Sequence, residues 1–230
     1  MTSAPAHRKP IVAIDGPVGA GKSTVAWAVA RRLGFRYVDT GAMYRSVAWA
    51  ALQRGIDLHD EAAVTALARS LRIEFHSDRD GQRVWIDGRD VTDDLRSPQV
   101  SDGASIVSVY PGVREAMVAI QRALGAQGGV VMEGRDIGTV VFPDAEVKIF
   151  LDASLEERAR RRYRELQARG VNVNLDAVRR AEEERDRRDR TRAHSPLQRA
   201  PGAVVIDSTQ MPADEVIERI AQLALRAKDE

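Results

Sequence analysis

Residues 11–23 of the chain read Ile11-Val12-Ala13-Ile14-Asp15-Gly16-Pro17-Val18-Gly19-Ala20-Gly21-Lys22-Ser23. The first four residues are apolar and mostly β-branched, which is typical of a strand buried on both faces of a parallel sheet. A glycine-rich turn follows, and then a helix is predicted from about Ser23 to Leu33, with Gly34 as its C-terminal cap. This succession of strand, turn and helix predicts the start of an α/β fold.

The turn matches the pattern G-x-x-x-x-G-K-S of a phosphate-binding P-loop, and it stands between a strand and a helix as that motif requires. Glycines let backbone N–H groups close around a phosphate, and the helix N-terminus adds partial positive charge. We therefore expect Lys22 to reach the β- and γ-phosphates of ATP and the Ser23 hydroxyl to hold Mg²⁺. The expected ATP-binding residues are Gly16, Pro17, Val18, Gly19, Ala20, Gly21, Lys22, Ser23 and Thr24.

The rest of the chain alternates in a similar way. Further core strands are predicted at residues 35–38, 130–133, 147–151 and 203–206, and helices at 43–54, 154–169, 176–192 and 212–227. Residues 61–126 differ, with a helix at 61–71, short strands near 72–76, 82–87 and 87–91, and helices that start at Ser97-Pro98 and Pro111. The helix at 154 opens with a capping box, Ser154 to Glu157. We predict an α/β fold with five strands in its core sheet and a small antiparallel insertion.

The composition excludes several classes of protein. The chain has 230 residues, which at about 150 per domain favours one core domain with an insertion or a small lid. It has no cysteine, which excludes a disulfide framework, a thiol nucleophile and a cysteine-ligated metal site. The 35 basic and 34 acidic residues nearly cancel, which disfavours a strongly basic nucleic-acid binder. No apolar run approaches the roughly 18 residues of a membrane span, and Met1–Pro10 lack the apolar segment of a signal peptide, so we expect a cytoplasmic protein.

Arginines follow two of the predicted core strands. Arg45 ends the segment Asp39-Thr40-Gly41-Ala42-Met43-Tyr44-Arg45, and Arg135 and Asp136 come directly after the strand at 130–133. Open α/β sheets bind ligands at the carboxyl ends of their strands, and arginine binds phosphate through paired hydrogen bonds. No Asn-Lys-x-Asp motif for guanine is present. The pattern favours a kinase whose acceptor is itself a phosphate, which needs no strong general base because this nucleophile is already anionic.

Simpler interpretations stand beside these. A single arginine after a strand is more often part of a surface ion pair. Glu133 either orients Mg²⁺-bound water or caps a loop, and Asp15 is interpreted as structural. The four histidines form no pair with metal-ligand spacing, and the three tryptophans are interpreted as packing residues.

Residues 156–192 contain thirteen arginines and nine acidic residues. A solvated, salt-bridged helical pair is one interpretation. Nucleic-acid binding is a weak one, because the interleaved acids would repel phosphates. We favour a lid of two helices, with a hinge at Gly170, whose arginines cover bound phosphates. At about 100° per residue, Arg185, Asp189 and Arg192 share one helical face, whereas Arg187, Arg188 and Arg190 point elsewhere.

The chain resembles the bacterial cytidylate kinase family, which are P-loop nucleoside monophosphate kinases, from Ile11 to the C-terminal helix. The resemblance rests on Ile14-Asp15-Gly16-Pro17, on the segment that ends at Arg45, on Gly134-Arg135-Asp136-Ile137-Gly138-Thr139-Val140-Val141-Phe142-Pro143, and on Glu184-Arg185-Asp186-Arg187-Arg188-Asp189-Arg190. It implies a core at about 11–40, 128–155 and 200–230, a substrate-binding insertion at 41–127 and a lid at 156–199. It also implies that the ATP γ-phosphoryl group goes to CMP or dCMP with Mg²⁺.

The resemblance assigns roles residue by residue. The residues it places at CMP are Thr40, Tyr44, Arg45, Ser105, Arg114, Arg135, Asp136, Arg185, Asp189 and Arg192, and those it implies in catalysis are Lys22, Arg135, Arg185 and Arg192. A carboxylate such as Asp136 or Asp189 accepts a hydrogen bond from the exocyclic amine of cytosine and repels the carbonyl of uracil. We expect a monomer with no nucleic-acid or membrane partner. The alternatives are a kinase for UMP or dTMP, and a nucleotide-binding regulatory or RNA-associated protein.

Overall fold

The structure is a computed structural model that describes residues 9–77 and 81–229. Residues 1–8 of the expected leader, and residues 78–80 of the turn between the first two short strands, lie outside the described residues. Among the described residues no helix combines the length and apolar character that crossing a membrane would need.

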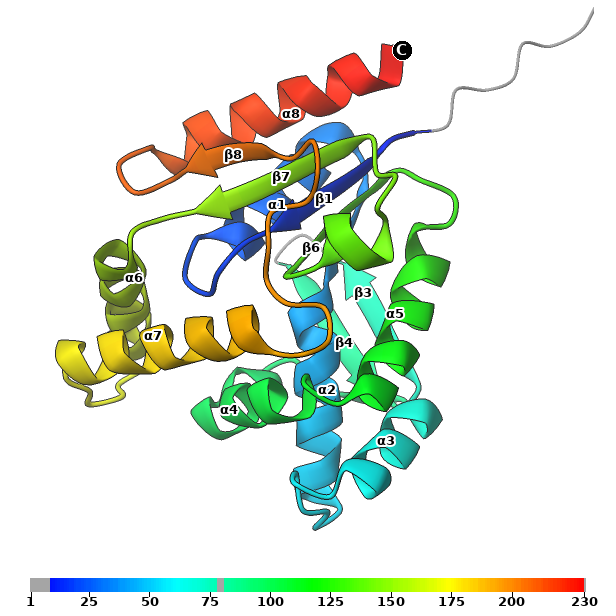
Figure 1. The fold of residues 1–230 in the computed structure, drawn as a ribbon, viewed down its shortest axis with the longest axis vertical. Helices are drawn as coiled ribbons and strands as arrows, with labels where there is room; N and C mark the ends of the chain where they lie inside the picture. The colour runs from blue at the N-terminus through cyan, green and yellow to red at the C-terminus, as the bar shows by residue number, and fades with distance from the viewer. Residues whose placement is uncertain (1–8, 78–80, 230) are drawn as a thin grey trace, which may run out of the picture.

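The centre of the fold is a parallel sheet with the order β2 (Arg36–Asp39), β6 (Val130–Gly134), β1 (Ile11–Asp15), β7 (Val147–Asp152) and β8 (Val204–Asp207). Every residue of β1 is buried, because this strand lies in the middle of the sheet with helices on both faces (Figure 1). The predicted sheet of five parallel strands is confirmed. All five strands point the same way, so their carboxyl ends meet at one edge.

Two helices cover one face of this sheet. α1 (Lys22–Leu33) and α8 (Ala213–Asp229) pack on each other and share an apolar cluster with β1 and β7. The opposite face is covered by the π-helical turn η2 (Ile137–Val141), which the sequence did not predict. The buried carboxylate of Asp15 accepts the N–H groups of Ile137 and Gly138, each at 2.8 Å, so Asp15 anchors this turn to β1 as a structural residue.

The insertion after β2 has its own apolar core. Its elements are α2 (Thr40–Gln53), α3 (Glu61–Ser70), β3 (Ile73–Ser77), β4 (Gln82–Ile86), β5 (Arg89–Asp90), η1 (Asp94–Arg96), α4 (Pro98–Val107) and α5 (Pro111–Gly125). The three short strands form an antiparallel sheet in the order β3-β4-β5, as predicted. Helix α2 packs against α4, and α3 packs against α5.

The predicted start of the second helix at Met43 is wrong. α2 begins at Thr40, because the side chain of Asp39 accepts the N–H of Ala42 at 3.0 Å and caps the helix. Residues 40–45 therefore form the first turns of a helix that follows β2 without a loop. This places Thr40, Tyr44 and Arg45 on a rigid element.

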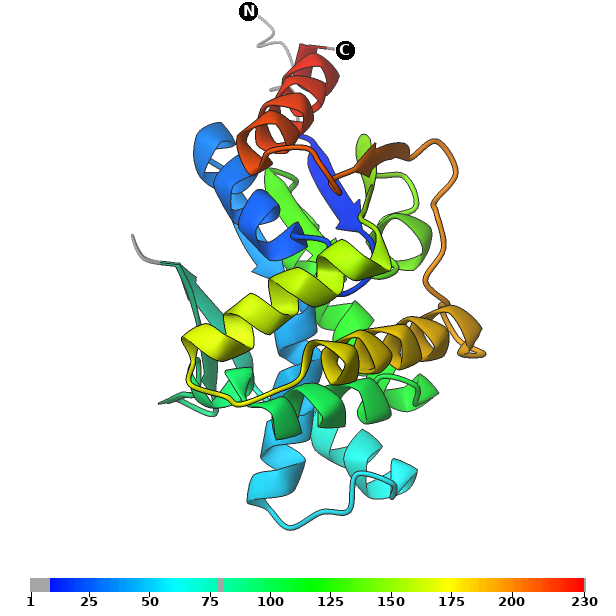
Figure 2. The same ribbon diagram turned by 90° about the vertical axis from the view of Figure 1, so that its left-hand side faces the viewer.

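The last part of the fold is the pair α6 (Leu155–Ala168) and α7 (Leu175–Thr191), which pack on each other through Ala159, Leu166 and Val178. The pair extends from the carboxyl end of β7, and in both views α7 lies beside α4 of the insertion (Figures 1 and 2).

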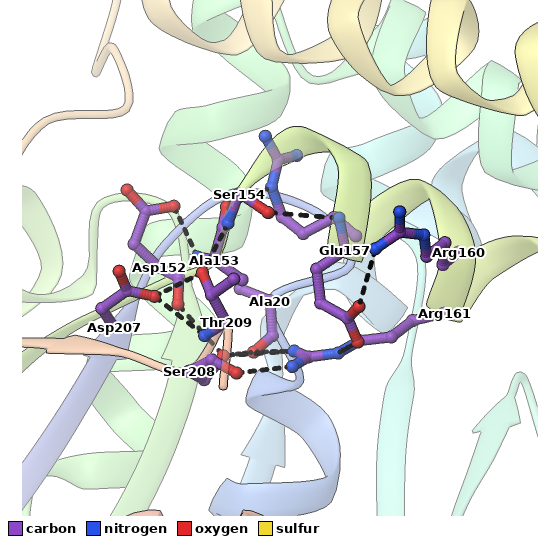
Figure 3. A network of polar contacts seen from close by, with 11 residues as sticks. Ala20, Asp152, Ala153, Ser154, Glu157, Arg160, Arg161, Asp207, Ser208 and Thr209 are labelled. Atoms are coloured by element: carbon purple, nitrogen blue, oxygen red, sulfur yellow. Dashed lines mark hydrogen bonds and ion pairs between the residues drawn. The ribbon is translucent and has the colours of Figure 1, made fainter. Parts of the chain in front are cut away.

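Only half of the predicted capping box of α6 forms. Ser154 Oγ accepts the N–H of Glu157 at 3.3 Å, but the Ser154 N–H donates to Thr209 Oγ1 at 2.9 Å (Figure 3). Glu157 turns instead toward Arg161, with Nε to Oε1 at 3.0 Å. The Ser154 N–H is already bonded to Thr209, so the second hydrogen bond of a capping box is not formed.

Candidate active site

A cavity of about 770 Å³ lies where the carboxyl ends of the core strands, the insertion and the α6–α7 pair meet. The predicted site residues that line it are Val18, Gly19, Gly21, Lys22, Ser23, Thr24, Thr40, Tyr44, Arg45, Ser105, Arg114, Glu133, Arg135, Asp136, Arg185, Asp189 and Arg192. Gly16, Pro17 and Ala20 are not among the lining residues. The polypeptide thus brings together residues that are up to 174 positions apart in the sequence (192 minus 18).

The P-loop occupies one end of the cavity. Gly19 and Gly21 have φ of 74° and 88°, a left-handed conformation that side chains rarely adopt. Gly21 caps α1 without a side-chain hydrogen bond, so the first N–H groups of the helix have no capping side chain. Free N–H groups at a helix N-terminus bind anions, which fits a nucleotide phosphate at this end.

Lys22 is buried at this helix N-terminus, 5% exposed, and its Nζ donates to the carbonyl oxygen of Pro17 at 2.6 Å. Burial is the main cause that lowers the pKa of Lys22 to about 7, and the nearby guanidinium of Arg135 contributes to the same shift. A phosphate at this position would favour the charged amine again, so binding of an anion and protonation of Lys22 are coupled.

Glu133 forms the floor of the cavity at the end of β6. Its Oε1 accepts the hydroxyl of Tyr37 at 2.5 Å, and its backbone carbonyl accepts the Thr40 hydroxyl at 2.7 Å. Burial raises the pKa of Glu133, and Asp39 raises it further. The carboxylate faces the same cavity as the Ser23 hydroxyl.

This donor set fits Mg²⁺ bound mainly through phosphates and water. Among the described residues no three His, Cys, Asp or Glu side chains are placed to ligate a metal. Mg²⁺ usually keeps several waters and takes one or two protein oxygens beside the phosphates of its substrate. The hydroxyl of Ser23 and the carboxylate of Glu133 can supply these one or two protein oxygens.

Arg45, in the first two turns of α2, is fixed in position by an ion pair. Its Nη2 lies 2.6 Å from Oδ2 of Asp39, the same carboxylate that caps the helix. Burial lowers the pKa of Arg45, but Asp39 together with Glu133 and Tyr37 outweighs burial, so the pKa is raised. One carboxylate thus fixes both the helix and the guanidinium.

Arg114 and Asp136 form a buried pair on the insertion side of the cavity. Nη2 of Arg114 bonds Oδ2 of Asp136, Nη1 donates to the carbonyl of Ser108 at 3.1 Å, and the guanidinium lies over the ring of Tyr44 at 5.4 Å. Nη2 of Arg192 lies 4.0 Å from the other carboxylate oxygen.

Some polar atoms of this wall make no hydrogen bond to any described residue. Within the described part of the chain, Ser105 Oγ, Arg114 Nε and Arg192 Nη2 are buried and make no hydrogen bond. Buried polar groups are nearly always bonded, so such atoms indicate where a polar ligand binds.

A second buried pair joins the core to α7. Nε of Arg135 donates to Oδ2 of Asp189 at 2.8 Å. Burial would raise the pKa of Asp189, but Arg135 and Arg185 outweigh it and the pKa is lowered. Burial together with Arg135 lowers the pKa of Arg185 to about 10. The cations outnumber their carboxylates here, which leaves this centre able to attract an anion.

Comparison with known proteins decides the family. Residues 12–226 match the family model described as cytidylate kinase. The chain is 53% identical over 212 residues to a cytidylate kinase of Pelotomaculum thermopropionicum, covering 92% of this chain and 94% of that protein. It is 52% identical over 216 residues to one of Geobacillus kaustophilus, covering 94% and 96%.

The chain belongs to the cytidylate kinase family. Among solved structures, a gluconokinase from Sinorhizobium meliloti 1021 is similar at 15% identity with a TM-score of 0.49, covering 97% of this chain and 95% of that one.

Within this cytidylate kinase fold, α7 presents the face that its helical spacing predicts. Arg185, Asp189 and Arg192 all line the cavity. The helix ends at Thr191, so Arg192 is its C-terminal cap and not one of its helical residues. Arg187 is exposed and pairs with Glu184 at 2.7 Å.

Sequence reasoning missed residues that contact the P-loop from α6. Arg161 donates to the carbonyl of Ala20 at 3.4 Å and to Ser208, at 3.1 Å to Oγ and 2.6 Å to the carbonyl (Figure 3). Tyr37 was also missed. The arginine-rich composition of α6 was the only signal, and it does not distinguish these arginines from their exposed neighbours.

ATP binding should take up a proton through Lys22. At pH 8 the amine of the free protein is mostly neutral because its pKa is near 7, and the bound phosphates restore the ammonium. Titration calorimetry with MgATP in two buffers of different ionisation enthalpy should show uptake approaching one proton at pH 8 and less at pH 6. The Lys22→Met variant should lose this uptake, and an unchanged uptake in the variant would contradict the assignment.

Alanine substitutions along α7 should separate its two faces. Arg185→Ala and Arg192→Ala each remove charged hydrogen bonds worth about 1.5–3 kcal/mol, so kcat/KM for CMP should fall roughly 10- to 150-fold. Arg187→Ala and Arg190→Ala, which are exposed, should change it little. Equal losses in all four variants, small or large, would disprove the specific role of this face.

Proposed function

We propose that this chain transfers the γ-phosphoryl group of ATP to CMP or dCMP, giving ADP and CDP or dCDP, in pyrimidine nucleotide metabolism. The observation that carries the proposal is one cavity with a P-loop at one end and a second set of buried cations, paired only in part, at the other. Two phosphate sites in one cavity are what transfer between two nucleotides needs.

In this mechanism the chain mainly positions and neutralises phosphates. The P-loop N–H groups and Lys22 hold the β- and γ-phosphates. Arg45, Arg114 and Arg135 hold the acceptor phosphate, and Arg192 reaches it from the side of the lid. Arg135 and Arg185 stabilise charge on the transferred group, because Arg135 lies near enough to affect the charge of both Lys22 and Arg185. No side chain needs to act as a strong base, because the acceptor oxygen is already anionic.

Mg²⁺, when bound, would neutralise charge on the ATP phosphates, with the Ser23 hydroxyl and, through water, Glu133 as the protein groups that hold it. The α6–α7 pair is proposed as the lid that excludes water once both nucleotides are present.

Recognition of the base is assigned to the insertion side. Asp136 accepts a hydrogen bond from the exocyclic amine of cytosine, and Ser105 Oγ, which makes no hydrogen bond within the described residues, supplies a donor to the base or the sugar. Asp189 is proposed to contact CMP from the side of the lid. We infer a cytoplasmic monomer that acts without nucleic acid or membrane.

CMP should exceed UMP as acceptor by at least about 10²-fold in kcat/KM at neutral pH, because a carboxylate facing the uracil carbonyl leaves both oxygens unpaired. A coupled assay of ADP release across CMP, dCMP, UMP, AMP and dTMP measures this. Asp136→Asn should lower the ratio of kcat/KM for CMP to kcat/KM for UMP, because the amide also has a donor for the carbonyl of uracil. Comparable rates with CMP and UMP would show a general pyrimidine kinase, and turnover of none of the five would refute the proposal.

A further inference from the structure

Arg158, in the first turn of α6, touches three separate parts of the molecule. Its Nε donates to the carbonyl of Ala153 at 2.9 Å, its Nη1 to the carbonyl of Val18 in the P-loop at 3.2 Å, and its Nη2 to Oδ2 of Asp186 on α7 at 2.6 Å. The side chain is only 5% exposed. It is not among the residues that line the cavity.

The contact with the P-loop is close as well as polar. A Cβ built on Gly19 would lie 2.9 Å from Cβ of Arg158 and 3.2 Å from its carbonyl oxygen. The tip of the loop therefore packs directly on the first turn of α6. A shift of residues 18–19 on binding a phosphate would move Arg158 with it.

Asp186 links Arg158 to the part of the cavity where the nucleoside monophosphate is proposed to bind. It follows Arg185 directly and precedes Asp189 by one turn, and both of those side chains line the cavity. Its other oxygen, Oδ1, is buried and has no hydrogen-bond partner within residues 9–77 and 81–229. The ion pair with Arg158 is thus the main interaction that holds the Asp186 carboxylate. Separation of the pair would leave two buried charges without a partner of opposite sign.

We propose that the Arg158–Asp186 pair couples the two nucleotide sites, so that a nucleoside triphosphate bound at the P-loop sets the position of Arg185 and Asp189 for a nucleoside monophosphate. Both residues are positioning residues in this scheme and touch neither substrate. The inference rests on the proposed function. The coupling is reciprocal, because each ligand must strengthen the other by the same factor.

Direct binding of phosphate by Arg158 is the competing assignment, and the contacts argue against it. Each of the three guanidinium nitrogens already donates to a protein oxygen, and the side chain lies outside the cavity wall. The other alternative is that the Arg158–Asp186 pair only stabilises the fold. In that case, breaking the pair would lower the stability of the protein without changing the coupling between the two nucleotide sites.

The test compares Asp186→Asn with Glu184→Gln. Both substitutions remove one negative charge from α7, and both weaken one ion pair with an arginine. Asp186 is tied to Arg158, whereas Glu184 is exposed and pairs with Arg187. Calorimetry measures the affinity of a non-hydrolysable ATP analogue with Mg²⁺, with and without saturating CMP, and thermal melts record stability in parallel.

The wild type should bind the analogue at least about fivefold more tightly when CMP is present, the lower end of usual coupling. Asp186→Asn should bring this ratio close to one, while the affinity for the analogue alone stays within about threefold. Glu184→Gln should keep the ratio of the wild type. The reverse titration, CMP with and without the analogue, must give the same factors.

Three results would overturn the inference: a wild-type ratio of one, a wild-type ratio retained in Asp186→Asn, or an equal loss in Glu184→Gln. If Asp186→Asn does not fold, Asp186→Ala replaces it, and failure of both to fold would assign the pair to stability instead. A wild type that does not bind CMP would refute the proposed function itself, whereas CMP turnover without coupling would refute only this inference.

Discussion

Burial of positive charge around one cavity is the constraint on which the rest of the structure depends. The cations concerned are Lys22, Arg45, Arg114, Arg135, Arg185 and Arg192, all of which line it. Removal of a charged group from water is expensive unless a partner is supplied. Burial accordingly lowers the pKa values of Lys22 and Arg185. The carboxylates of Asp39, Asp136 and Asp189 offset part of this cost of burial and fix the directions of their arginines. Buried nitrogens of Arg114 and Arg192 that make no hydrogen bond within the described residues are proposed to bind the acceptor phosphate.

The fold serves this constraint by bringing rigid elements to the carboxyl edge of a single sheet. The P-loop follows β1, Asp39 ends β2, Glu133 and Arg135 lie at the end of β6, and α6 follows β7. A parallel sheet places all these ends side by side. Asp15, at the end of β1, holds the π-helical turn beside Asp136 and is used for structure rather than for chemistry.

Much of this was predictable, and what was missed has physical reasons. The P-loop and the buried strands have local signatures, and helical periodicity selected the face of α7 that lines the cavity. The start of α2 was misplaced because Asp39 ends a strand and caps a helix at once, which leaves no loop between them. Tyr37 and Arg158 have no local signature, since their partners Glu133 and Val18 are 96 and 140 positions away. Such pairs are created by the fold.

We propose that these arginines are held together for ligand binding at a cost to the stability of the free protein. The unfolding free energy of Arg185→Met tests this proposal most directly. Burial and Arg135 disfavour the charge at this position, so the ligand-free variant should be more stable than the wild type by about 0.5–2 kcal/mol in denaturant titrations at neutral pH. Its affinity for CMP should fall. Arg187→Met, at an exposed position, should change neither quantity. A loss of stability in Arg185→Met would contradict the account.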